Sequence, residues 1–175
     1  SFGRIDILGN AAGGAFAAPA LDVSDNGWDA VLRENLKSTF ICCKAVGKVM
    51  VSQKRGSIIN FASMAGRASS AGNAHYGAAK AGIINLTQSL AEEWGPYTVR
   101  VNALAPGTIK SEGWVRVQAQ WRGREEADIA KGIALGRLGV PDDVAGVAVF
   151  LASDASEYIT GQTINVNGGE RGYYS

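Results

Sequence analysis

The sequence predicts an α/β fold in which a parallel sheet is covered by helices on both faces. Three short apolar runs, residues 5–9, 57–62 and 99–104, alternate with longer stretches whose apolar residues recur at helical spacing. A fourth run, residues 163–166, follows the last of these stretches. Strands that alternate with helices are typical of a parallel sheet, so we expect about four strands with flanking helices.

The composition is that of an ordinary globular domain and excludes several classes of function. The 175 residues are 46% hydrophobic and 19% charged, which is enough for one domain with a sizeable core. The 17 basic and 16 acidic residues are mixed along the chain, so nothing favours nucleic acid or a membrane surface as a partner. No run approaches 18 apolar residues and the first residues lack a signal-peptide pattern, so we expect a cytoplasmic protein.

The two cysteines, Cys42 and Cys43, are adjacent in a helical stretch and match no metal-binding or redox spacing. We expect both to be small core residues, and we predict no metal site.

The first predicted strand, residues 5–9, is followed by a loop of small residues. This loop reads Asn10-Ala11-Ala12-Gly13-Gly14. Small side chains allow a ligand to approach the backbone closely, although a plain tight turn would have the same composition.

A long helix is predicted from about residue 26 to residue 51, with Ser24 or Asp25 as its N-cap. Asn35 interrupts its apolar stripe. A polar residue at that position is either a buried amide with satisfied hydrogen bonds or a functional group.

A second helix is predicted to begin near Ala74, and it carries the residues with the clearest chemistry. Tyr76 and Lys80 are four apart, so their side chains share one face of the helix. A free tyrosine titrates near ~10, and acid–base work near neutral pH requires a shift of roughly 3 units, to which an adjacent cation contributes. Ser63 follows the strand at 57–62 and can present its hydroxyl to the same cleft. The pattern predicts that the three side chains converge at a proton-transfer site, although a Tyr and a Lys at this spacing also occur as a plain surface pair.

The rest of the chain supplies the surroundings of this site. We expect the loop at 64–73 to border the substrate and His75 to be a structural or pocket-lining residue. The strand at 99–104 ends in a turn, Pro106-Gly107-Thr108-Ile109, and residues 111–132 have the polar composition of a mobile helical lid. Pro141 begins a further helix, and the last strand ends at Gly168-Gly169.

Four of these motifs together resemble the short-chain dehydrogenase/reductase family. The stretch Tyr76-Gly-Ala-Ala-Lys80, with Ser63 thirteen residues before the tyrosine, is similar to the active-site signature of the family. The loop that begins at Asn10 is similar to its Asn-Asn-Ala-Gly motif, with Ala11 in place of the second asparagine. Asn35 matches the active-site asparagine, and the turn at 106–109 matches an element that contacts the nicotinamide.

The resemblance implies a Rossmann-type doubly wound sheet and an NAD- or NADP-dependent oxidoreductase that interconverts an alcohol and a carbonyl. Tyr76 would exchange the proton and Ser63 would stabilise the reacting oxygen. Lys80 would lower the pKa of the phenol and hold the nicotinamide ribose, and Asn35 would support a water relay. The implied cofactor-binding residues are Asn10, Ala11, Ala12, Gly13, Tyr76, Lys80, Pro106, Gly107, Thr108 and Ile109. A small-molecule substrate and a homo-oligomer, either a dimer or a tetramer, are also implied.

The sequence contains no glycine-rich phosphate loop after a first strand, which dinucleotide folds place before the part present here. We therefore expect residues 1–175 to be a single partial domain, the catalytic portion of a longer polypeptide. Two alternatives remain. One is an enzyme that reduces enoyl-CoA thioesters, similar to members that share the loop at 10–14 and the Ser111-Glu112-Gly113 sequence. The other is a fragment without cofactor that serves as an assembly or binding module.

Overall fold

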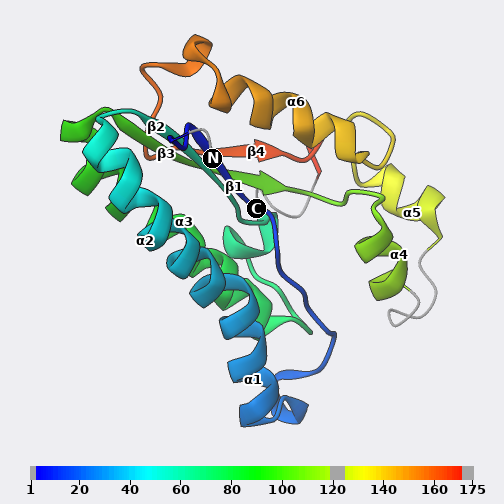
Figure 1. Ribbon diagram of the computed structural model, residues 1–175. Coiled ribbons are helices and arrows are strands. Elements are labelled where there is room, and N and C mark those ends of the chain that lie inside the picture. Colours follow the sequence, from blue (N-terminus) through cyan, green and yellow to red (C-terminus); the bar gives the residue numbers. More distant parts are fainter. Residues whose placement is uncertain (1–2, 119–124, 171–175) are drawn as a thin grey trace.

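The sheet of the computed structural model, which describes residues 3–118 and 125–170, has four parallel strands in the order β1-β2-β3-β4 (Figure 1). The strands are β1 (Ile7–Asn10), β2 (Gly56–Phe61), β3 (Val99–Pro106) and β4 (Thr163–Val166). Asn10 pairs with Asn60, Phe61 with Leu104, and Pro106 with Val166. The carboxyl ends of all four strands therefore meet at one edge of the sheet, where parallel α/β sheets place their ligands. The predicted fold class is confirmed.

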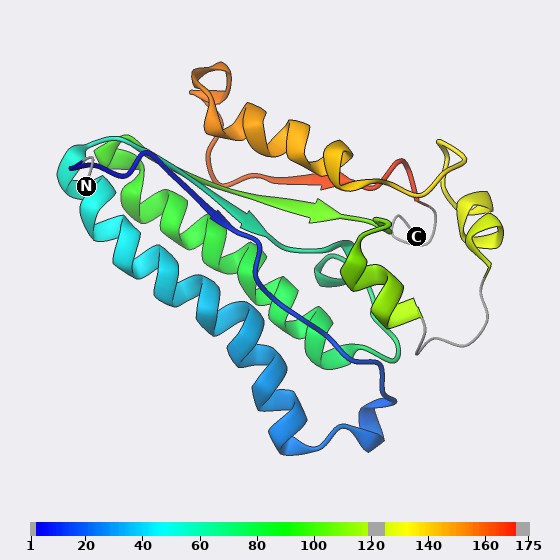
Figure 2. The same cartoon turned by 45° about the vertical axis from the view of Figure 1, so that its right-hand side comes forward.

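The helices form two layers around the sheet. On one face lie α1 (Asp25–Leu32), α2 (Ser38–Gln53) and α3 (Ala74–Trp94), and α6 (Pro141–Ala152) covers the other face (Figures 1 and 2). Two short helices, α4 (Glu112–Gln118) and α5 (Glu126–Lys131), lie together beyond the carboxyl ends of the strands. The fold thus leaves the ligand-binding edge of the sheet between α3 and the segment that contains α4 and α5.

Each face of the sheet has its own apolar core. On the α2 and α3 side, Met50, Ile58 and Val101 are fully buried. On the α6 side, Leu104 and Leu151 are fully buried. Side chains of β2 and β3 alternate between these two cores, as expected for strands that are covered on both faces.

The predicted helix at 26–51 is interrupted, which corrects the expectation of one continuous element. Ser24 caps α1 by accepting a hydrogen bond from the amide of Gly27, and a π-helical turn, Arg33–Lys37, then joins α1 to α2. Within it, the Asn35 amide donates to the carbonyl oxygen of Val31 at 2.9 Å, and Thr39 Oγ1 donates to the carbonyl oxygen of Asn35 at 2.8 Å. Polar side chains that compete for helical carbonyl oxygens favour such a distortion, and π turns are frequent at functional sites.

The two adjacent cysteines have different environments. Cys43 is fully buried, as expected, whereas Cys42 is exposed, so the prediction that both are core residues is wrong for Cys42. Neighbouring residues on a helix point about 100° apart, and only one of the two can face the sheet.

The polar segment predicted to be a lid, residues 111–132, contains α4 and α5, and its middle part, residues 119–124, lies outside the described residues. Among the described helices, none is long and apolar enough to cross a membrane.

Candidate active site

The carboxyl end of β2 and the first turns of α3 bring Ser63, Tyr76 and Lys80 together. Ser63 follows β2 directly and accepts a hydrogen bond from the amide of Ala65 at 3.2 Å. Its side chain also interacts with the Tyr76 phenol. Lys80 Nζ lies 5.4 Å from the centroid of the Tyr76 ring and donates to the carbonyl oxygen of Phe61 at 2.8 Å. The end of one strand and one face of one helix therefore hold a hydroxyl, a phenol and an ammonium group in a single cluster.

Burial dominates the acid–base properties of this cluster. Burial raises the pKa of Tyr76, and the interaction with Ser63 opposes that shift. Burial also lowers the pKa of Lys80 to about 8. The causes of the Tyr76 shift are its burial and Ser63, so the expectation that Lys80 lowers the pKa of the phenol stays a prediction.

Asn35 faces the same cluster from the π-helical turn and is fully buried. Its amide donates to the carbonyl oxygen of Gly14 at 2.8 Å as well as to Val31. Its carbonyl oxygen, Oδ1, accepts no hydrogen bond from the described residues. Such an acceptor usually binds a partner, because an unsatisfied buried polar group costs about 1–3 kcal/mol.

Gly13 connects Asn35 with Lys80. A Cβ atom on Gly13 would lie 2.3 Å from Asn35 Oδ1 and 3.6 Å from Lys80 Nζ. Only glycine fits at that distance, so the loop after β1, the π-helical turn and α3 meet at this point. Ala11, Ala12 and Gly13 are exposed, which leaves their backbone accessible to a ligand.

The side chain of Asn10 has a different role from the loop that it begins. It is buried, and its amide donates to Asn60 Oδ1 at 2.8 Å and to Cys43 Sγ at 3.2 Å. Asn60 in turn donates to Thr87 Oγ1 at 3.0 Å. This chain of polar groups ties β1, β2 and α3 together behind the site. Sequence analysis missed Asn60 and Thr87, although an asparagine within an otherwise apolar strand was the available signal.

The turn at the end of β3, Pro106 to Ile109, is half-buried. The amide of Gly107 donates to the carbonyl oxygen of Val166 at 3.0 Å. The Thr108 amide and hydroxyl both donate to Glu170, at 2.9 and 2.7 Å. Sequence analysis did not identify Glu170, which is 62 residues from its partner.

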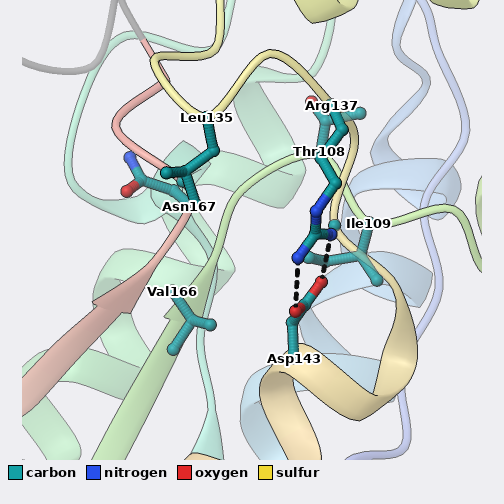
Figure 3. Close-up of a pocket in the computed structure, with 9 residues that line it drawn as sticks. Thr108, Ile109, Leu135, Arg137, Asp143, Val166 and Asn167 are labelled. Atoms are coloured by element: carbon teal, nitrogen blue, oxygen red, sulfur yellow. Dashed lines mark hydrogen bonds and ion pairs between the residues drawn. The ribbon is translucent and has the colours of Figure 1, made fainter.

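A pocket of about 180 Å³ lies behind this turn (Figure 3). Figure 3 shows Arg137 and Asp143 joined by two hydrogen bonds of 2.7 and 2.8 Å at one side of it. Thr108 and Ile109 line this pocket, but none of the tyrosine cluster does. The cluster of Ser63, Tyr76 and Lys80 is therefore separate from this pocket.

The loops that border the cluster are joined to each other. The Phe16 ring packs against the ring of His75, with centroids 4.4 Å apart, and the amide of Ala18 donates to the carbonyl oxygen of Gly72 at 2.9 Å. His75 is fully buried, and neither ring nitrogen has a hydrogen-bond partner among the described residues. Sequence analysis did not identify Phe16, because an isolated aromatic residue in a loop of small residues gives no spacing signal.

Comparisons with known proteins place this geometry in context. A family model described as enoyl-(acyl carrier protein) reductase matches residues 1–170. The chain is 41% identical to a probable 2,4-dienoyl-CoA reductase of Bacillus subtilis (strain 168), in a match that covers 97% of the chain and 67% of that protein. It is 44% identical to a 3-oxoacyl-[acyl-carrier-protein] reductase of Synechocystis sp. (strain ATCC 27184 / PCC 6803 / Kazusa), in a match that covers 96% of the chain and 66% of that protein.

Solved structures give the same result. A gluconate 5-dehydrogenase from Burkholderia cenocepacia J2315, in complex with NADP and tartrate, superposes with a TM-score of 0.89 at 35% identity, and the match covers 95% of the chain and 64% of that protein. The chain thus spans about two thirds of the length of the proteins it matches.

Proposed function

The chain belongs to the short-chain dehydrogenase/reductase family, and on that premise we propose that it is the catalytic portion of an NAD(P)-dependent oxidoreductase acting on an alcohol–carbonyl couple. Its parallel sheet is of the Rossmann type that this family of oxidoreductases uses. The observation that carries the proposal is the convergence of Ser63, Tyr76 and Lys80 at the carboxyl ends of the strands. We further propose that residues 1–175 form one partial domain.

In the direction of reduction, Tyr76 gives its phenolic proton to the carbonyl oxygen of the substrate. Ser63 interacts with the Tyr76 phenol, and we expect its hydroxyl to hold the same oxygen. The reverse reaction uses the same groups, with the phenolate accepting the proton of the alcohol. Proton transfer by a positioned side chain contributes about 10²–10⁴-fold to a rate.

The residues around the cluster fit the nicotinamide end of a cofactor. Gly13 leaves a position that a Cβ atom would fill beside Asn35 and Lys80, and the backbone of Ala11 and Ala12 is accessible. When bound, NAD or NADP would accept or supply the hydride. Lys80 would hold the nicotinamide ribose, and the turn from Pro106 to Ile109 would contact the carboxamide.

Asn35 and Lys80 are placed to return the proton to Tyr76. The unsatisfied Oδ1 of Asn35 and the ammonium of Lys80 both border the position of a Cβ atom on Gly13. A water bound between an acceptor and a donor forms bridging hydrogen bonds of ordinary strength. With a pKa of about 8, Lys80 carries its proton at neutral pH and exchanges it readily with such a water.

A second candidate function is the reduction of a conjugated enoyl or dienoyl thioester, which the similarity to the Bacillus subtilis protein favours. The pairing of Ser63 with Tyr76 supports the carbonyl reaction instead, because that chemistry protonates an oxygen. Assays with 3-oxoacyl, 2-enoyl and 2,4-dienoyl thioesters, and with simple sugar alcohols, distinguish the two. Turnover of the enoyl substrates alone would reverse our preference.

We propose that residues 111–132 act as the substrate lid. The part that the structure describes is held by exposed contacts, such as the 2.9 Å ion pair between Lys110 and Glu126. Exposed ion pairs contribute little stability. Hydrogen exchange in α4 and α5 should be much faster than in β2, and equal protection in these elements would contradict a lid.

We also propose a cytoplasmic homo-oligomer that assembles through α2 and α3. Apolar side chains are exposed on α2, with Phe40 at 44%, Ile41 at 53% and Val49 at 37%. Sedimentation measures the assembly directly. A monomeric Ile41→Glu variant, beside an oligomeric wild type, would support this surface.

The central experiment measures cofactor binding by residues 1–175 and by the same chain extended at its N-terminus with a glycine-rich βαβ unit. The chain offers groups only for the nicotinamide end, whereas phosphates bind at a glycine-rich turn and helix N-terminus. Losing two or three charged hydrogen bonds, worth roughly 1.5–3 kcal/mol each, weakens binding by several orders of magnitude. We expect negligible binding and turnover by the chain alone and clear turnover by the extended polypeptide.

No nicotinamide binding by the extended polypeptide would refute the proposed function and support the binding-module alternative. Micromolar affinity of the chain alone would instead contradict our account of where the phosphates bind.

A further inference from the structure

The turn that follows β3 is held by a single carboxylate. Glu170 Oε2 accepts from the amide of Thr108 at 2.9 Å, and Glu170 Oε1 accepts from the Thr108 hydroxyl at 2.7 Å. The packing is close, because a Cβ atom on Gly107 would lie 2.5 Å from Glu170 Oε2. Hydrogen bonds to a charged acceptor are about twice as strong as neutral ones, so this pair fixes Thr108 firmly.

The approach of Glu170 to the turn is determined by the backbone around it. Gly168 and Gly169 have positive φ values of 61° and 74°, which turn the chain back after β4. The amide of Leu135 donates to the carbonyl oxygen of Gly168 at 3.0 Å, and the amide of Glu170 donates to that of Asn167 at 3.0 Å. These two hydrogen bonds therefore hold the segment that carries the Glu170 carboxylate.

The backbone amides of the turn differ in whether they have a hydrogen-bond acceptor. The amides of Gly107, Lys110 and Ser111 donate to carbonyl oxygens at 3.0, 2.8 and 2.8 Å, respectively, and that of Thr108 donates to Glu170. Among the amides of residues 107–111, only that of Ile109 has no acceptor within the part of the chain that the structure describes. Backbone donors in folded proteins almost always find a partner, so this N–H group is available to an acceptor on a ligand.

We propose that Glu170 is a positioning residue for the nicotinamide end of the cofactor: by holding both donors of Thr108, it presents the amide of Ile109 to the carboxamide oxygen. The inference rests on the proposed function, since the ligand is the nicotinamide carboxamide. A carboxylate suits this role because both of its oxygens are acceptors and its charge strengthens both hydrogen bonds, whereas a glutamine is neutral and offers one acceptor oxygen.

The test uses the extended polypeptide and two ligands, NAD(H) or NADP(H) and the matching ADP-ribose, which lacks the nicotinamide. Because a charged hydrogen bond is worth about tenfold or more in an equilibrium constant, Glu170→Gln and Thr108→Val should each weaken cofactor binding in calorimetry by about tenfold. Binding of the ADP-ribose should stay within about twofold of wild type, since that ligand does not reach the turn. The double variant should lose no more than the weaker-binding single variant, and Thr108→Ser should bind as wild type.

Glu157→Gln, which changes an exposed glutamate far from the turn, is the matched control. Equal losses for both ligands would show that Glu170 only supports the fold, and additive losses in the double variant would show that it does not act through Thr108. Either result overturns the proposal. If the wild type binds the ADP-ribose but no nicotinamide cofactor, the proposed function and this proposal both fail. If the wild type binds neither ligand, only the proposed function is in question. Hydrogen exchange of the Thr108 amide then decides whether Glu170 holds Thr108, because Glu170→Gln must accelerate that exchange.

Discussion

We call Ser63 and the first turns of α3 the α3 wall. The side chains of this wall are positioned by residues that are close in the sequence. The second wall, the turn from Pro106 to Ile109, is held by Glu170, which is 62 residues away from Thr108. In the α3 wall, two residues that are four apart lie next to each other on one face of the helix. In the second wall, the backbone is instead positioned by a contact between residues that are far apart in the sequence.

Burial differs between the walls in the same way. Lys80 is 5% exposed and donates to the carbonyl oxygen of Phe61. Beside the turn, Arg137 and Asp143 form an exposed pair, with side chains 54% and 32% exposed. Under the proposed function, the buried wall carries the chemistry and the more exposed wall contacts the ligand. Perturbations of the α3 wall should therefore have the larger effects.

The largest effect is expected from Tyr76→Phe, which removes only the phenolic hydroxyl. Loss of a positioned proton donor should lower kcat by about 10²–10⁴-fold in the extended polypeptide, with little change in thermal unfolding. Tyr97→Phe, which changes an exposed tyrosine at the far end of α3, is the matched control. A loss of less than about tenfold in kcat would show that the α3 wall does not take part in proton transfer.

Lys80→Met tests the burial of charge in the same wall through the pH dependence of stability. Lys80 has a pKa of about 8 in the folded chain and 10.5 when unperturbed, so the unfolded chain binds more protons between these values. The stability of the wild type should therefore rise relative to Lys80→Met as pH rises from 8 to 10.5, by about 3 kcal/mol. Denaturant unfolding of both proteins across this range measures the difference. A difference that does not vary with pH would mean that Lys80 is solvated.

Gly66→Ala tests how closely the α3 wall is packed. The added Cβ atom would lie 2.6 Å from the backbone carbon of Lys80 and 2.7 Å from the backbone nitrogen of Ala81. Backbone atoms within α3 cannot move aside easily, so we expect a loss of about 1–3 kcal/mol in the free energy of unfolding. Gly146→Ala, with nothing within 4 Å, should instead stabilise α6 by about 0.5–1 kcal/mol. Equal effects of the two substitutions would contradict close packing at Gly66.

The smallest effect is expected beside the turn, for Asp143→Asn. The guanidinium of Arg137 and the amide of Val140 hold the pKa of Asp143 well below its usual value of 3.8. This carboxylate therefore contributes stability that is present above pH 3.8 and is lost as the pH falls below it. Asp143→Asn should be slightly less stable than wild type at pH 7 and indistinguishable from it in strong acid. A larger loss than that of Gly66→Ala would contradict the difference between the walls.

The sequence was informative where function depends on local spacing. The fold class followed from alternating apolar runs, and the pairing of Tyr76 with Lys80 followed from their separation of four. The rise in the pKa of Tyr76 could not be predicted from the sequence, because the desolvation of a side chain depends on everything that packs around it. Glu170 could not be found in this way, since no local pattern connects a glutamate with a threonine 62 residues earlier.

The π-helical turn at Arg33–Lys37 has a consequence for how this segment can tolerate changes in length. Each residue of an α-helix advances the side-chain direction by about 100°, and a π turn holds roughly one residue more than an α turn. Deleting one residue between α1 and α2 would restore a regular α turn that covers the same rotation, so α1 and α2 would keep their orientation relative to each other. The change would fall on the turn itself, which holds Asn35 beside Gly13. A deletion of one residue in this segment should therefore disturb the site more than the packing of the two helices.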